Sequence, residues 1–100
     1  MLIIAGVVKT DPARRDEVVA AAIAMMKEAR KHLGCISYVI SADFEDPSVL
    51  HVFEEWQSAE THRAHVADLH VEAARLAAGD RGMREVSFRR YEIASVGPIA

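Results

Sequence analysis

The feature that most constrains the fold is the spacing of the apolar residues, which changes along the chain between the period of a strand and the period of a helix. Strand-like runs and alternations of apolar residues occupy positions 2–9, 35–43, 49–56 and 85–94. Helical spacing of apolar residues fills 12–32, and two shorter helical segments are expected over 59–66 and 69–78. A change of period fixes a change of element, because side chains alternate across a strand but recur every third or fourth residue on a helix.

Local signals agree with these boundaries. Asp11-Pro12 is typical of a helix start, and Gly34 of a helix end. Ser58 and Asp68 are expected to cap the two later helices. The order β-α-β-β-α-β predicts an α+β domain with a ferredoxin-like, split β-α-β antiparallel sheet. With 100 residues, we expect a single domain, 1–100.

One sheet face is expected to need a partner. In the predicted fold the helices cover only one face of the sheet. Several strand segments are nevertheless apolar on both faces, as in Ile3-Ile4, Val7-Val8 and Val52-Phe53. A second copy of the chain is the simplest cover for the other face, so we expect a homodimer that packs sheet against sheet. In the last strand, the apolar positions change register after Phe88, which indicates a β-bulge.

Charge and composition exclude several classes of partner. The net charge is −3, without a basic footprint, so neither nucleic acid nor an anionic membrane is expected as a partner. No apolar run approaches the roughly 20 residues that span a bilayer. The single cysteine, Cys35, permits no disulfide within the chain and fits a reducing compartment. We therefore expect a cytoplasmic protein.

The chemistry-bearing residues concentrate between positions 50 and 71. The strand over 49–56 places Glu54 and Trp56 on one face, beside Leu50 and Val52. The helical segment that follows carries His62, His65 and His70. A carboxylate, an aromatic ring and imidazoles at one strand–helix junction favour a small apolar pocket with a few polar groups. Each residue also has a structural interpretation: Trp56 as core, Glu54 in a buried ion pair, and His65 on a helix surface.

The chain resembles the antibiotic biosynthesis monooxygenase family of dimeric α/β-barrel proteins. The resemblance covers nearly the whole chain and rests on Gly34-Cys35 with Tyr38, the turn 43–47, Glu54-Glu55-Trp56 with Ser58, Ala64-His65, and His70. It implies a dimeric barrel and an oxygenase that uses neither metal nor flavin. In such an enzyme an electron-rich phenol or enol loses a proton, and its anion reduces O2 directly.

The resemblance also implies roles for particular residues. His65, Glu54 and Tyr38 are the expected catalytic groups, as bases or as donors to the developing oxyanion. Trp56, His70 and Met25 are the expected substrate-binding residues, with Trp56 as a flat wall for an aromatic ring. The expected substrate is a small aromatic or enolic compound, quinol-like or polyketide-like.

Two departures and two alternatives remain open at this stage. Val7, His65 and Arg75 stand where the haem-degrading branch uses Asn, Trp and His, which argues against haem. In the family that this chain resembles, a proline often precedes the histidine that corresponds to His70; here that position is Leu69. His62 and His65 are three residues apart, but nothing completes a metal site with them.

The alternatives to the monooxygenase are an isomerase of a small hydroxy-ketone and a ligand-binding or stress-response barrel without chemistry.

Overall fold

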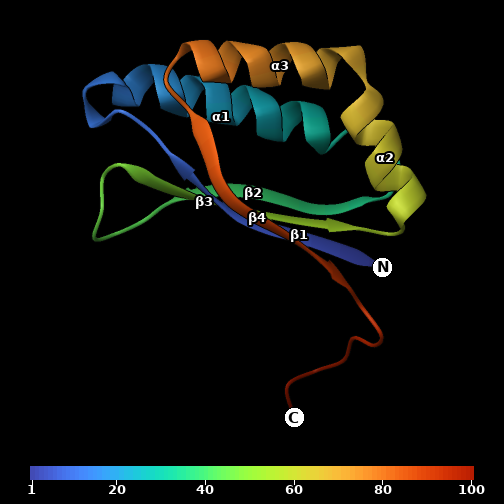
Figure 1. The fold of residues 1–100 in the computed structure, drawn as a ribbon. Coiled ribbons are helices and arrows are strands. Elements are labelled where there is room, and N and C mark those ends of the chain that lie inside the picture. The colour runs from blue at the N-terminus through green and yellow to red at the C-terminus, as the bar shows by residue number, and fades with distance from the viewer.

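The computed structural model describes all 100 residues, 1–100, in the predicted order of elements (Figure 1). The strands are β1 (Leu2–Lys9), β2 (Cys35–Ala42), β3 (Val49–Trp56) and β4 (Arg84–Glu92), and the helices are α1 (Arg15–Ala29), α2 (Ala59–Ala67) and α3 (Leu69–Asp80). A 3-10 turn, η1 (Pro12–Arg14), precedes α1. None of the helices is both long enough and apolar enough to cross a membrane.

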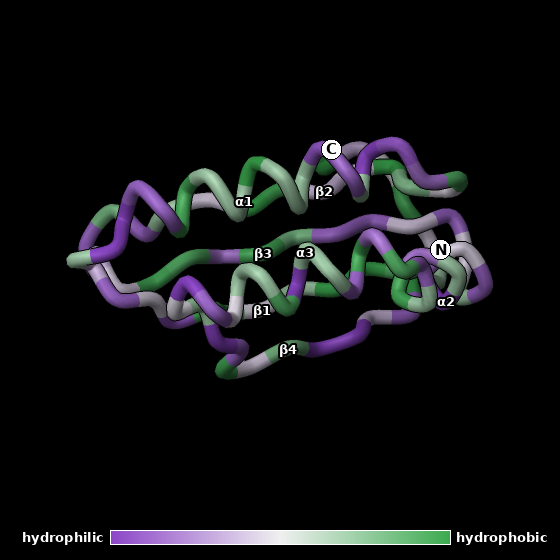
Figure 2. The backbone as a smooth tube through the Cα atoms, turned by 90° about the horizontal axis from the view of Figure 1, so that it is seen from above, coloured by the Kyte–Doolittle hydropathy of each residue, from purple (hydrophilic) through white to green (hydrophobic).

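The strands form one antiparallel sheet in the order β2-β3-β1-β4, which confirms the ferredoxin-like prediction. All three helices lie on one face of the sheet, and the other face is bare (Figure 1). Seen from above, α1 and α3 run side by side, and β4 lies beyond α3 without a helix over it (Figure 2). The sheet therefore has one covered face and one open face.

The core follows the alternation of the strands. Leu50, Val52, Glu54 and Trp56 of β3 are all buried, whereas His51 and Phe53 are exposed on the opposite face. The core is completed by α1, whose buried side chains are mostly small: Val18, Ala21, Ala22 and Ala29.

The first helix is shorter than the sequence predicts. The α-helix ends at Ala29, so His32, expected as its last residue, lies in the following turn, and Leu33 is exposed. Gly34 adopts a positive φ of 82°, and a Cβ there would lie 2.5 Å from a side-chain atom of Thr61. The turn thus depends on a glycine, and it presses against the start of α2.

Both edge strands carry a bulge. In β4 the register with β1 shifts at Val86, which confirms an irregularity in this strand but places it before Phe88 instead of after it. A second shift, between Cys35 and Ser37 of β2, was not predicted. It leaves Ile36 out of the strand alternation, and Ile36 is exposed, whereas Tyr38 is buried.

Candidate functional site

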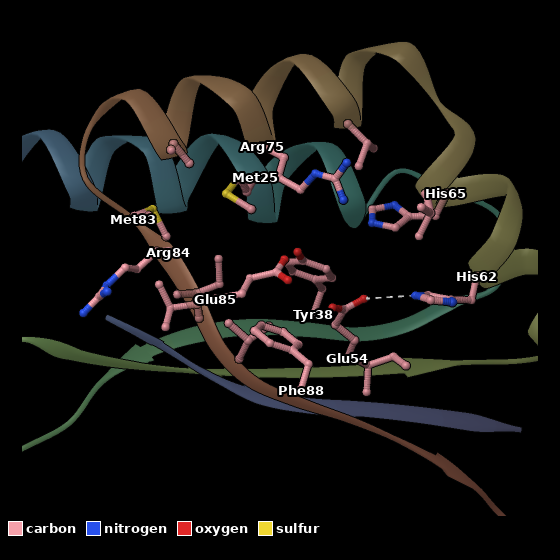
Figure 3. Close-up of a pocket in the computed structure, with 18 residues that line it drawn as sticks. Met25, Tyr38, Glu54, His62, His65, Arg75, Met83, Arg84, Glu85 and Phe88 are labelled. Carbon is pink, nitrogen blue, oxygen red and sulfur yellow. Dashed lines mark ion pairs between the residues drawn. The ribbon is translucent and has the colours of Figure 1, made fainter. Parts of the chain in front are cut away.

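A cavity of about 210 Å³ lies between the covered face of the sheet and the helices. Side chains from both layers point into it, with Met25 and Arg75 from the helices and Tyr38, Glu54 and Phe88 from the strands (Figure 3). Its wall is mostly apolar, and the polar or ionisable lining side chains are Tyr38, Glu54, His62, His65, Arg75, Arg84 and Glu85. An apolar cavity with a few convergent polar groups is the usual form of a small-molecule site.

Glu54 is the carboxylate held deepest in this site. Its position on β3 points it inward, and only 7% of the residue is exposed. Burial raises the pKa of Glu54 to about 7, with a small further rise from the charge of Glu85. The Trp56 indole opposes this shift by donating a hydrogen bond of 3.0 Å from Nε1 to Glu54 Oε1. The carboxyl can therefore take up or release a proton close to neutral pH.

Two histidines on α2 stand beside Glu54. Nε2 of His62 lies 4.0 Å from Oε1 of Glu54, the contact drawn in Figure 3. Desolvation lowers the pKa of His62, and the charge of Arg90 lowers it further, so this contact is no lasting ion pair near neutral pH. Burial also lowers the pKa of His65 to about 4, helped by His32 and then His62. Both imidazoles are neutral at pH 7.

Tyr38 and Met25 line the cavity. The Tyr38 ring is buried on β2, with its centroid 5.8 Å from that of His65. Desolvation raises the pKa of Tyr38 well above its usual range, with a smaller contribution from Glu54. The phenol therefore stays protonated, and its hydroxyl is available as a hydrogen-bond donor. Met25 reaches the cavity from α1 and is part of its apolar wall.

Two of the predicted substrate-binding residues do not line the cavity. Trp56 is fully buried, so it offers no wall to a substrate; its indole packs against the His65 ring, with centroids 4.6 Å apart. It acts on the site indirectly, through Glu54. His70 is exposed in the first turn of α3, where its backbone N–H donates to the capping Asp68. Its side chain is not among those that line the cavity.

Five cavity residues with polar or aromatic side chains were not among the expected site residues, namely His62, Arg75, Arg84, Glu85 and Phe88. Phe88 lies on β4 directly opposite Gly6 of β1. A Cβ at Gly6 would lie 2.5 Å from the Phe88 ring, so this glycine admits the ring. A glycine inside an apolar strand is the signal that could have revealed this close approach. Arg75 has no such signal, since its helix is polar on several sides.

One cluster of side chains outside the cavity has the composition of a cation site. Ligand-type atoms of Glu28, His32 and Asp68 lie within 4.8 Å of one another. Both carboxylates face Nε2 of His32, at 3.5 Å for Glu28 and 3.9 Å for Asp68. Both carboxylates are thus near the same imidazole nitrogen, and we interpret the cluster as a contact between His32 and its two flanking carboxylates. Neither His62 nor His65 belongs to this cluster.

The fold and the cavity together define a class: small α+β proteins with a ferredoxin-like sheet and a cavity with buried ionisable side chains between the sheet and the helices. Within that class, the model of the family "Antibiotic biosynthesis monooxygenase" matches residues 1–76. The chain belongs to this family. The matched part contains β1 to β3, α1, α2 and most of α3, and so includes Tyr38, Glu54 and His65.

Solved structures support the same fold. A candidate antibiotic biosynthesis monooxygenase from Deinococcus radiodurans superposes with a TM-score of 0.90 at 20% identity, over 100% of this chain and 99% of that one. One from Chloroflexus aurantiacus gives 0.77 at 25% identity, over 99% and 98%. Rv0793 from Mycobacterium tuberculosis gives 0.77 at 22%, over 99% and 98%. None of the curated proteins matches this sequence.

Proposed function

We propose that this protein is a cofactor-independent monooxygenase that oxidises a small quinol-like or polyketide-like aromatic with O2. Membership of the monooxygenase family supports the class of reaction. The observation that best supports this site is the burial of the Glu54 carboxyl in an apolar cavity, which raises its pKa to about 7. A general base is most effective when its pKa lies near the working pH.

In the proposed reaction, Glu54 removes a proton from the activated carbon or hydroxyl of the substrate. Tyr38 and the neutral His65 donate hydrogen bonds to the oxygen that becomes negatively charged. The anion then gives electrons to O2, and oxygen adds to the carbon. For a methylene that becomes a carbonyl, one oxygen atom stays on carbon and the other leaves as water with the two hydrogens, so the substrate is the only reductant.

The size of the cavity limits the substrate. Its volume of about 210 Å³ is below the range of roughly 300–1,000 Å³ that holds drug-sized ligands. The apolar part of the wall is built mainly from aliphatic side chains, Met25, Met83 and Phe88. A compact aromatic of one to three fused rings fits this description better than a flexible or strongly polar molecule.

Oxygen uptake tests the proposal. Metal-stripped protein is mixed with hydroquinones, naphthols and anthrones, and uptake is compared with the autoxidation rate. We expect acceleration with at least one class, and a fall of about 10²-fold or more in Glu54→Gln, because general base catalysis contributes about 10²–10⁴-fold. Glu45→Gln, an exposed carboxylate in the β2–β3 turn, is the control. No acceleration with any class would contradict the proposal.

The same groups could serve an isomerase of a small hydroxy-ketone. Glu54 and His65, with pKa values displaced in opposite directions, suffice for proton transfer without O2. Turnover that continues unchanged under nitrogen would favour this reaction. A barrel without chemistry is less well supported, because the cavity is not filled by its own side chains.

A further inference from the structure

Arg75 is a cation in the cavity wall that has no partner in the chain. Six of the nine arginines form a hydrogen bond or an ion pair within the chain, namely Arg14, Arg15, Arg30, Arg63, Arg81 and Arg90. The other three are Arg75 and Arg84, which line the cavity, and Arg89, which lies on the open face of the sheet. Guanidinium groups without a partner are thus concentrated at the cavity.

The side chain of Arg75 extends from α3 into the space between the helices and the sheet (Figure 3). Glu54 and Phe88 project into the same space from the sheet. Two carboxylates line the cavity, Glu54 and Glu85, and neither forms an ion pair with Arg75. The one ion-pair contact drawn among the lining residues joins Glu54 to His62. The N–H groups of Arg75 are therefore bound to no other group of the protein.

The charges of the lining favour an anion over a cation. Arg75 and Arg84 are always protonated. Against them stand Glu85 and Glu54, and Glu54 is only partly ionised at pH 7, because burial raises its pKa to about 7. The two imidazoles of the lining are neutral at this pH. The lining thus has a small positive excess in a chain whose net charge is −3. Arg84 points away from the middle of the cavity, so Arg75 is the cation placed to hold an anion (Figure 3).

We propose that Arg75 determines the specificity of the cavity by binding a carboxylate on the substrate, which is therefore a small aromatic acid. The inference rests on the proposed function and adds to it the group by which the aromatic compound is recognised. With the carboxylate held on the helix side, the aromatic ring lies toward the sheet. There Phe88 supplies an apolar contact, and Glu54 meets the carbon or hydroxyl that loses its proton.

The chemistry of the guanidinium favours a carboxylate over a phosphate. Its planar fork of N–H donors matches the two oxygens of a carboxylate. A phosphate monoester carries about two negative charges at neutral pH, and it would face Glu85 and the partly ionised Glu54 with one guanidinium beside it. Arg75 is exposed and already hydrated, so the gain over water is moderate. We therefore expect a preference of about tenfold for the acid, at the lower end of hydrogen bonds to charged groups.

Binding of two unreactive compounds tests the inference without turnover. 2-Naphthoate carries the carboxylate, 2-naphthylmethanol has the same rings with a neutral group, and neither has a phenol to oxidise. NMR titrations of the backbone amides at pH 7 give both Kd values. We expect the wild type to bind 2-naphthoate about tenfold more tightly, and Arg75→Gln to lose this preference. Because Arg75 makes no bond within the chain, Arg75→Gln should fold as the wild type does.

Arg63→Gln is the matched control for this titration. It removes the same charge from α2, where Arg63 pairs with Glu60 on the surface, outside the cavity. We expect it to keep the preference of the wild type. Equal affinity of the wild type for the two compounds would overturn the inference. So would a preference that survives in Arg75→Gln, or one that is lost equally in Arg63→Gln.

Oxygen uptake separates this inference from the proposed function. With 6-hydroxy-2-naphthoate and 2-naphthol as a pair, we expect kcat/KM to be about tenfold higher for the acid. Arg75→Gln should raise KM for the acid and leave KM for 2-naphthol unchanged. Preferential binding of 2-naphthoate without any oxygen uptake would support the anion site and contradict the oxygenase. Uptake with both phenols but no preference for the acid would contradict the role of Arg75 alone.

Discussion

Glu54 and His65 make opposite contributions to stability as pH changes. The native state holds the Glu54 proton more tightly than the unfolded state, because its pKa is about 7 instead of 4.5. Stability from this residue is therefore fully present below pH 4.5 and is lost as pH rises through 7. His65 acts in the opposite sense: its pKa falls from 6.5 to about 4, so its contribution is lost as pH falls. Between pH 4.5 and 6.5 the two effects partly cancel.

Replacing the carboxyl should reveal this balance. We expect Glu54→Gln to become progressively more stable than the wild type from pH 4.5 to 7.5, by about 3 kcal/mol in total. Gln keeps an oxygen to accept from Trp56 but carries no buried charge. Urea unfolding across the pH range measures the difference.

Glu45→Gln serves as the control, because Glu45 is exposed. A difference between Glu54→Gln and the wild type that stays constant with pH would show that Glu54 is not the titrating group.

For single residues, the sequence predicts the sheet face on which a side chain lies, because strand alternation determines it. The inward direction of Tyr38 and Glu54 follows from the period of β2 and β3 and agrees with the structure. The position of Trp56 beneath the histidines does not follow, because alternation gives a side chain its face but not its depth. His32 could not be predicted, since its contact with His65 depends on α1 ending at Ala29.

Among the elements, α2 matters most for the site because it carries both His62 and His65. It is short, from Ala59 to Ala67, and only His65 among its residues is buried. Its start is held by a reciprocal cap, in which the Ser58 hydroxyl accepts from the Thr61 N–H and the Thr61 hydroxyl accepts from the Ser58 N–H. A short helix with little buried surface depends strongly on such a cap.

Removal of the cap should loosen this helix. We expect Ser58→Ala to lower the free energy of unfolding by about 1 kcal/mol. Amide hydrogen exchange in 59–67 should increase more than exchange in α1, because the cap serves α2 alone. Equal increases in both helices would show that α2 does not open independently.

The order of elements and most strand boundaries could be predicted, because each change of period and each cap is local. The two bulges and the early end of α1 could not be placed. They arise from contacts between distant segments, such as the turn at Gly34 against Thr61. β4 contributes to the cavity through Phe88 and Glu85, although its residues are mostly exposed and its pattern is weak.

One face of the sheet is not covered by helices and exposes several apolar side chains (Figure 1). Phe53 is 39% exposed there, opposite Val39 of β2, which is also 39% exposed, and Tyr91 of β4 is 45% exposed. We propose that a second copy covers this face, as the sequence predicts, because β-sheet faces with several apolar side chains are rarely left in water.

A positive charge introduced on the open face should prevent two copies of the chain from forming the proposed dimer. We expect wild-type protein to sediment as a dimer, and Phe53→Lys to sediment as a monomer with an unchanged circular dichroism spectrum. Leu69→Lys is the matched control, since Leu69 is 78% exposed on the helical side. Analytical ultracentrifugation across a range of concentrations distinguishes the two, and a monomeric wild type would contradict the proposal.

The bulges at Ile36 and Val86 lie on the two outermost strands, β2 and β4. An edge with a continuous ladder is a template onto which further chains can add without limit, whereas a bulge interrupts the ladder and twists the edge away. Both routes to fibre growth are obstructed in this molecule. In the dimer that we propose, each copy covers the open face of the other, so self-association through this face is expected to stop at a closed pair.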